Sequence, residues 1–133
     1  MKTVIITGAT SGIGLETARL LANRGYRVLG VGHSEKNCIR AEQELLTENS
    51  SAQISFYSGD LMQQREVLRV AADLSSELDR NNGDLYALIN NAGAVRSWYT
   101  TTEEGYEQQF ALNHLAGFLL TAELLPYLQK GQG

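Results

Sequence analysis

Short apolar runs alternate with amphipathic stretches along this chain of 133 residues, and no other feature restricts its fold as strongly. Four runs have the length and composition of strands: 3–7, 26–32, 53–58 and 84–90. Helical patterns follow the first three runs and begin near residues 12, 34 and 63. Strands that alternate with helices imply right-handed crossovers and a parallel sheet covered on both faces. The sequence therefore predicts a doubly wound α/β domain over residues 1–133.

Several residues mark where the helices begin and end. Ser34 is a candidate N-cap of the second helix, and Gly25 is a candidate stop for the first. After the fourth strand, Thr101 and Glu104 form a possible capping box, so we expect a last helix from about 103 to 129. Apolar or small residues recur along this helix at helical spacing: Phe110, Gly117, Leu120, Leu124 and Leu128.

Composition and charge exclude several classes of function. The formal net charge is −4, which draws the chain to neither nucleic acid nor an anionic membrane surface. No apolar run approaches the roughly 20 residues of a membrane span, and the N-terminus enters the first strand without a signal-peptide cleavage site. The single cysteine, Cys38, permits no internal disulfide. We therefore expect a cytoplasmic protein without a membrane or nucleic-acid partner, and we predict no metal site.

Three glycines follow the first strand and open the first helix: Gly8, Gly12 and Gly14. In doubly wound domains, ligands bind at the carboxyl ends of the strands. Glycine there lets the backbone approach a phosphate, which the free N–H groups of the helix N-terminus attract. No Lys-Ser/Thr pair follows the glycines, so the loop is not a nucleoside triphosphate P-loop. The pattern predicts a dinucleotide site; the alternative is a tight turn that needs glycine for packing alone.

The third and fourth strands end in polar motifs. Gly59, Asp60 and Leu61 follow the third strand, where a carboxylate can accept a hydrogen bond from an adenine amino group. Alternatively, Asp60 is a solvated residue near a helix start. The motif NNAG (90–93) follows the fourth strand. Side-chain amides at a buried strand end need hydrogen-bond partners, and we expect Asn90 to pin the sheet.

The motifs TGATSGIG (7–14) and NNAG (90–93) together resemble those of the short-chain dehydrogenase/reductase family. That family has the glycine motif T-G-x-x-x-G-x-G and a fourth strand that ends in N-N-A-G. Gly59-Asp60-Leu61 matches its adenine-pocket position, and Asn113 matches the helical asparagine of its catalytic tetrad. The stretch 101–128 is most similar to the branch with retinol dehydrogenases and protochlorophyllide reductases.

The resemblance implies a Rossmann fold and a nicotinamide-dependent oxidoreductase that interconverts a small-molecule carbonyl and an alcohol by hydride transfer. Asn113 is the candidate catalytic residue and would hold a water on the proton relay to a catalytic lysine. Alternatively, its amide is hydrogen-bonded locally within its helix. The other residues carried over would bind the adenosine and pyrophosphate (Thr7, Gly8, Thr10, Ser11, Gly12, Ile13, Gly14), the adenine (Asp60, Leu61) and the ribose (Asn91, Ala92, Gly93).

The end of the second strand should distinguish NADP from NAD. An acid there hydrogen-bonds the 2′-hydroxyl of NAD and repels the 2′-phosphate of NADP. Gly32 stands where NAD-dependent members of the resembled family place Asp, and His33 stands where NADP-dependent members commonly place Arg. Ser34 and the helix that it caps offer N–H groups to phosphate oxygens. We therefore expect NADP rather than NAD, with Lys36 and Arg40 nearby and Glu35 as an opposing charge.

The catalytic Tyr-x-x-x-Lys motif of the resembled family has no counterpart in this chain, because none of its tyrosines has a lysine four residues later. We therefore expect the N-terminal, NAD(P)-binding portion of a longer oxidoreductase, truncated after four strands and a long helix and inactive by itself. Two alternatives remain open: a non-catalytic nucleotide-binding or regulatory module, and a half-protein that assembles with itself or with a separate chain. The fourth strand would form an exposed apolar edge, so we also expect a homo-oligomer.

Overall fold

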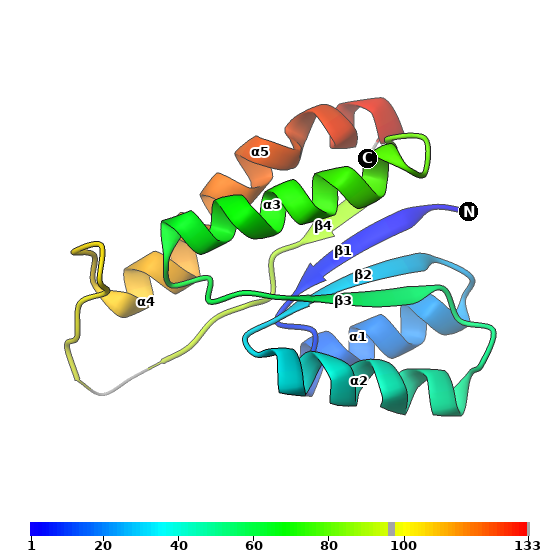
Figure 1. Cartoon of the computed structure of the whole chain (residues 1–133), viewed down its shortest axis with the longest axis horizontal. Coiled ribbons are helices and arrows are strands. Elements are labelled where there is room, and N and C mark those ends of the chain that lie inside the picture. Colours follow the sequence, from blue (N-terminus) through cyan, green and yellow to red (C-terminus); the bar gives the residue numbers. More distant parts are fainter. Residues whose placement is uncertain (96–97, 133) are drawn as a thin grey trace.

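Four parallel strands form one sheet in the order β3-β2-β1-β4, and helices cover both of its faces (Figure 1). This computed structural model describes residues 1–95 and 98–132. The strands are β1 (Thr3–Thr7), β2 (Arg27–Gly32), β3 (Ile54–Ser58) and β4 (Ala87–Ile89). The helices are α1 (Gly12–Asn23), α2 (Glu35–Glu48), α3 (Gln64–Asp79), α4 (Gln108–Phe110), the π-helical turn η1 (Ala111–Leu115) and α5 (Ala116–Gly131). The predicted doubly wound α/β fold is confirmed.

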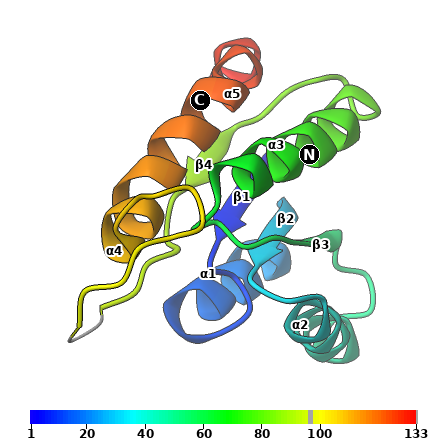
Figure 2. The same ribbon diagram turned by 60° about the vertical axis from the view of Figure 1, so that its left-hand side comes forward.

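Two hydrophobic clusters, one on each face of the sheet, hold these layers together. Helices α1 and α2 lie on one face, and α3 and α5 lie on the other, as Figure 1 and Figure 2 both show. The cluster on the α1 side includes Val4 and Ile6, whereas Ile5 and Leu29 belong to the cluster on the α3 side. Successive side chains of a strand point to opposite faces, so β1 contributes to both clusters. Strands buried on both faces need continuous apolar sequences, which explains the run TVIIT.

The predicted ends of the first two helices are confirmed. Ser34 caps α2, because its Oγ accepts a hydrogen bond from the N–H of Asn37 at 3.2 Å. Gly25 lies just beyond α1 and has a φ of +89°. That left-handed conformation favours glycine and prevents the helix from continuing.

The last helical segment begins later than predicted and has a different cap. Glu107 is the N-cap, and its carboxylate accepts hydrogen bonds from the N–H groups of Gln109 and Phe110, both at 2.9 Å. These two hydrogen bonds lower the pKa of the Glu107 carboxyl, since they stabilise its charged form. Thr101 lies outside the helix and forms an isolated antiparallel bridge with Glu107.

Glu104, the second member of the predicted capping box, binds a different helix. Its carboxylate accepts hydrogen bonds from the backbone N–H of Gln64 and, at 3.2 Å, from that of Arg65. These N–H groups belong to the first turn of α3, where they have no partner within the helix. The predicted Thr101–Glu104 capping box is therefore wrong, because the start of a neighbouring helix binds the glutamate.

The π-helical turn η1 changes which side chains face the core. Leu120 and Leu124 are buried as predicted, whereas half of the Phe110 side chain is exposed. A π-helical turn contains one more residue than an α-helical turn, and one residue corresponds to about 100° of rotation. Residues before η1 therefore lie on a different face from the one that the regular spacing predicts. The ring of Phe110 stacks on that of His114, with ring centroids 5.3 Å apart.

Strand β4 is shorter than the predicted 84–90 and forms one edge of the sheet. Its three residues pair only with β1. Just before it, the N–H of Leu85 donates to the carbonyl of Tyr127 in α5 at 3.0 Å. The predicted exposed edge at the fourth strand is confirmed.

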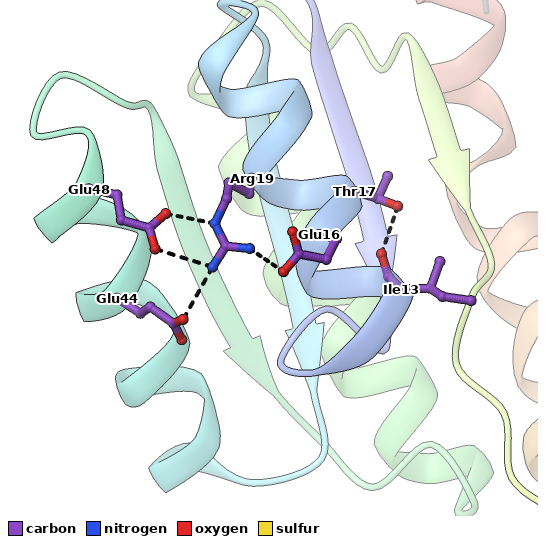
Figure 3. Close-up of polar contacts among 6 residues, drawn as sticks. All are labelled: Ile13, Glu16, Thr17, Arg19, Glu44 and Glu48. Carbon is purple, nitrogen blue, oxygen red and sulfur yellow. Dashed lines mark hydrogen bonds and ion pairs between the residues drawn. The ribbon is translucent and has the colours of Figure 1, made fainter.

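Arg19 joins α1 to α2 (Figure 3). Its Nε donates to Glu48 at 2.6 Å, its Nη2 donates to Glu44 at 3.1 Å, and its Nη1 pairs with Glu16. Exposed ion pairs each contribute little to stability, but here one planar guanidinium engages three carboxylates from two helices. The contacts with Glu44 and Glu48 join the C-terminal half of α2 to α1.

Candidate nucleotide-binding site

A cavity of about 250 Å³ opens at the carboxyl ends of the strands. In Figure 1 this is the end toward which the arrowhead of β1 points, and the segment that leads to α4 lies on the same side. The segments that follow parallel strands converge at such an edge. Many of the predicted cofactor residues line the cavity together: Gly8, Thr10, Ser11, His33, Asp60, Leu61, Ala92 and Gly93.

The loop after β1 needs glycine for its conformation and for its packing. Gly8 and Gly12 have φ values of +65° and +56°, in the left-handed region. A Cβ at Gly14 would overlap the carbonyl oxygen of Gly8 and lie 2.6 Å from Nδ2 of Asn91. The loop thus closes tightly and brings the N-terminus of α1 to the cavity. The side chain of Ser11, the N-cap of α1, makes no capping hydrogen bond, which leaves the first N–H groups of this helix for an anion.

Hydrogen bonds fasten the end of β4 to this glycine loop. Oγ1 of Thr7 accepts from the N–H of Asn91 at 3.1 Å and from that of Ala92 at 3.0 Å. Nδ2 of Asn91 donates to the carbonyl of Gly8 at 3.1 Å. Thr7 and Asn91 therefore support the cavity from behind and do not line it. The predicted need of Asn91 for a backbone partner is met by Gly8.

Asn90 has a different role from the one predicted. Its Nδ2 donates to Oγ1 of Thr121 on α5 at 3.1 Å, so it pins a helix rather than the sheet. Gly117 lies opposite this contact, and a Cβ there would lie 3.4 Å from Cγ of Asn90, at ordinary contact distance.

At the end of β2, Gly32 leaves no room for a side chain. A Cβ there would overlap the methyl group of Thr10 and lie 2.8 Å from Sγ of Cys38. Burial raises the pKa of the Cys38 thiol, and its S–H donates to the carbonyl of Tyr57 at 3.5 Å. Cys38 is therefore a neutral packing residue. A side chain on this strand end would require the side chains of Thr10 and Cys38 to shift.

His33 and Asp60 face each other across the mouth of the cavity. Nδ1 of His33 lies 3.9 Å from Oδ1 of Asp60, and the imidazole is the more exposed of the two side chains. Oδ1 of Asp60 also accepts the N–H of Met62 at 3.1 Å. Asp60 thus closes the turn before α3 and lines the cavity at the same time. Ser34, which is predicted to bind phosphate, uses its hydroxyl to cap α2.

The turn η1 directs Asn113 onto the segment that follows β4. Its Oδ1 accepts the N–H of Ala94 at 2.8 Å, and its Nδ2 donates to the carbonyl of Ala94 at 2.7 Å. The alternative of a hydrogen bond within its own helix is therefore wrong. Asn113 and Thr7 line a second cavity of about 30 Å³, which shares Leu61 and Ala92 with the larger one. That volume is enough for one water molecule.

Two further predicted cofactor residues lie outside the lining of this cavity. Gly12 and Ile13 line an open surface on α1, where the Ile13 side chain is 79% exposed. Ile13 therefore does not contribute its side chain to the cavity.

Six lining residues were not among the predicted cofactor-binding residues: Val31, Gly32, Gly59, Met62, Ala94 and Leu112. Met62 and Ala94 directly follow the strand-end motifs, so the sequence contained a signal for them. Leu112 lines the cavity from η1, and the regular apolar spacing of the last helix does not reveal that turn.

Known proteins share both the motifs and the geometry. A sequence profile of the short chain dehydrogenase family matches residues 2–133. The chain belongs to the short-chain dehydrogenase family. The resemblance inferred from TGATSGIG and NNAG is thereby confirmed.

The chain is 38% identical over 128 residues to human retinol dehydrogenase 13, covering 96% of this chain and 38% of that protein. It is also 38% identical over 130 residues to human retinol dehydrogenase 11, covering 97% of this chain and 39% of that protein. The chain thus spans about two fifths of the length of these curated relatives.

Solved short-chain dehydrogenases have the same fold. One from Sphingobium yanoikuyae in complex with NADPH superposes with a TM-score of 0.79 at 29% identity, covering 98% of this chain and 49% of that one. A bulky-bulky ketone specific alcohol dehydrogenase from Comamonas testosteroni gives a TM-score of 0.78 at 28% identity, covering 98% and 51%. The predicted Rossmann fold is confirmed, and the glycine loop, with its close backbone packing, fits a nicotinamide dinucleotide.

Two other features are absent from residues 1–95 and 98–132: a cluster of metal ligands and a helix that could span a membrane. No three His, Cys, Asp or Glu side chains gather there as a metal ion would require. In the same residues, no helix combines the length and the apolar character that crossing a bilayer demands.

Proposed function

We propose that this chain binds NADP and is the nucleotide-binding portion of an oxidoreductase that interconverts a carbonyl and an alcohol. The main support for this proposal is the cavity at the strand ends. The glycine loop lines this cavity, and a hydrogen bond from Asn91 to Gly8 holds the loop in place. Such a loop offers the N–H groups of α1 to a pyrophosphate and lets the backbone come close to it. When bound, the nicotinamide supplies the hydride chemistry, and residues 1–133 bind and orient it.

Each wall of the cavity has a proposed role. Thr10 and Ser11 contact the phosphates at the start of α1, and the side chain of Leu61 and the carboxylate of Asp60 meet the adenine. Ala92 and Gly93 leave space for a ribose, since neither has a large side chain. Asn113 holds the segment after β4 through Ala94, and a water in the small cavity beside it would join a proton relay.

NADP is proposed rather than NAD because of the end of β2. The packing of Thr10 and Cys38 around Gly32 opposes the carboxylate that would bind the 2′-hydroxyl of NAD. His33 lies beside that position with an exposed ring. Related structures with NADPH or NADP are consistent with this choice.

Catalysis is proposed to need residues beyond those of this chain. Hydride transfer to a carbonyl requires a positioned proton donor at its oxygen. In the family motif Tyr-x-x-x-Lys, the tyrosine is that donor and the lysine follows four residues later. No tyrosine of this chain has a lysine at that spacing, so we expect the isolated chain to be inactive. The relatives named retinol dehydrogenases suggest a lipophilic carbonyl or alcohol as the substrate.

Self-association and a cytoplasmic location are also proposed. β4 is an edge strand, and the exposed Phe118 and Leu125 of α5 line one apolar surface with Asn90, which a second copy would cover. The single buried cysteine is compatible with a reducing compartment. Sedimentation velocity over a range of protein concentrations tests the first proposal, and a monomer at every concentration would contradict it.

The experiment for the proposed function is a titration of the chain with NADPH, followed by nucleotide fluorescence. We expect saturable binding by the wild type and none by Gly14→Ala, because the new methyl group would displace the carbonyl of Gly8. The control is Gly117→Ala, which adds the same group to α5 at ordinary contact distance and should leave binding intact. A folded wild-type chain that does not bind NADPH would refute the proposal.

A separate assay tests the proposed inactivity. NADPH consumption with an aldehyde such as retinal should not exceed the background rate. Turnover by the purified chain that Asn113→Ala abolishes would contradict it.

A further inference from the structure

The cavity that is proposed to bind NADP lacks a strong positive charge of its own. Within the described residues, its lining contains no lysine or arginine, and the acid Asp60 faces His33 at 3.9 Å. A 2′-phosphate at the end of β2 would therefore meet a carboxylate as well as an imidazole. A cation must come from outside the lining if this end of the cavity is to prefer a phosphate.

Arg40 lies beside this part of the wall. It belongs to α2, and its Nη2 donates to the backbone carbonyl of Thr10 at 3.1 Å. Thr10 lines the cavity, and its methyl group packs against Gly32 at the end of β2. Arg40 is exposed, so its guanidinium lies beside the cavity wall near the place where NADP and NAD differ.

The charge of Arg40 is not neutralised by an ion pair. Among the described residues, no carboxylate lies within ion-pair distance of its guanidinium. Glu44, one turn further along α2, pairs with Arg19 instead (Figure 3). A guanidinium has five N–H donors, and the contact with Thr10 uses only one of them. Within the part of the chain that the structure describes, the other donors have no hydrogen-bond partner and can reach a phosphate.

We propose that Arg40 is the residue that selects NADP over NAD in this chain. It keeps its hydrogen bond to Thr10 and directs further N–H groups to the 2′-phosphate, between Thr10 and His33. This inference rests on the proposed function, because it requires a dinucleotide in the cavity. Arg40 thereby supplies from α2 the cation that the described lining of the cavity lacks.

The test is a comparison of NADP and NAD binding in matched variants. Arg40→Gln removes the charge, Arg40→Lys keeps it without the planar fork, and Arg24→Gln removes an exposed arginine at the end of α1 as the control. A charge-assisted contact corresponds to about tenfold or more in affinity. We expect Arg40→Gln to weaken NADP at least about tenfold and to leave NAD within about twofold, with Arg40→Lys between Arg40→Gln and the wild type.

Other outcomes would overturn the inference in distinct ways. An equal loss for both nucleotides would mean that Arg40 only holds the glycine loop through Thr10. No loss for either would mean that the 2′-phosphate binds elsewhere. Thermal unfolding of each variant checks that it folds, and 2′,5′-ADP against 5′-AMP repeats the comparison without the nicotinamide half. If the folded wild type binds neither NADP nor NAD, the proposed function itself fails, and this inference fails with it.

Discussion

Strands β1 and β2 differ sharply from β4, although all belong to one sheet. Every residue of β1 is buried, and so are all residues of β2 except the first, whereas the three residues of β4 are only partly buried. The central strands have neighbours on both edges and helices on both faces, but β4 pairs with β1 alone. Burial of apolar side chains is the main source of stability, so the two regions should differ in how much each side chain contributes.

The cavity spans both regions, and different forces hold its two walls. The wall after β1 and β2 rests on strands that apolar packing fixes. The wall after β4 depends on polar contacts instead: Asn91 and Thr7 join it to the glycine loop, Asn90 joins it to α5, and Asn113 holds Ala94. Hydrogen bonds of Asn90 and Asn91 therefore stabilise this edge strand, whereas an interior strand is stabilised mainly by packing.

The largest expected effect comes from truncating paired residues in the two regions. Ile5 and Leu88 are partners in the β1–β4 register, and both pack into the cluster on the α3 side. Ile5 is fully buried, so Ile5→Ala should lower the free energy of unfolding by about 2–5 kcal/mol. Leu88→Ala should cost about 1–2 kcal/mol, because less apolar surface is buried there. Urea titrations measure both values, and equal losses would contradict the proposed difference.

The next effect concerns the hydrogen bonds that fasten β4. Thr7→Val keeps the shape of the side chain but leaves the N–H of Ala92 without its acceptor, whereas the N–H of Asn91 still donates to the carbonyl of Ile89 at 3.0 Å. An unsatisfied buried group costs about 1–3 kcal/mol, so we expect a loss in this range. Thr3→Val, at the start of the same strand, is the control and should change stability by less than about 0.5 kcal/mol. A similar loss in both variants would show that Thr7 acts through burial alone.

The well-buried region was also the part that the sequence predicted closely. The signals there are local: a β-branched run for β1, Ser34 as a cap and Gly25 as a stop each determine the backbone within a few residues. Local chemistry and the final fold agree at these positions.

The β4 side was predicted less well, because contacts distant in sequence determine it. Thr101 and Glu104 have the residue types and spacing of a capping box, but the carboxylate of Glu104 accepts hydrogen bonds from N–H groups at the start of α3 instead. The turn η1 places Asn113 against Ala94, and periodicity in the sequence contains no sign of the extra residue in that turn. A pattern that assumes regular helix therefore placed Phe110 on the wrong face.

A smaller effect is expected where the β4 side contacts α3. Glu104→Gln should weaken the capping of α3 and cost about 0.5–2 kcal/mol, as the loss of a helix cap does. Glu103→Gln is the matched control: among the described residues, this carboxylate pairs with the exposed side chain of Arg65 at 2.5 Å, and it should contribute less than about 1 kcal/mol. Thermal unfolding compares the two. A larger loss in Glu103→Gln would mean that the ion pair, rather than the cap, fastens this segment.

The smallest effect is a pH dependence in the well-buried region. The guanidinium groups of Arg80 and Arg27 lower the pKa of the Glu77 carboxyl through hydrogen bonds and charge. A carboxyl with a lowered pKa in the folded state stabilises the fold above its unfolded pKa, and this stability is lost as the pH falls through the folded value. The advantage of the wild type over Glu77→Gln should therefore be constant from pH 7 to 5 and shrink below about pH 4.3. Its size should be at most about 1 kcal/mol, since Arg80 is largely exposed. Glu123→Gln, on the exposed face of α5, should follow the wild-type profile at every pH. A difference between wild type and Glu77→Gln that persists unchanged to pH 3 would show that the charge of Glu77 does not contribute.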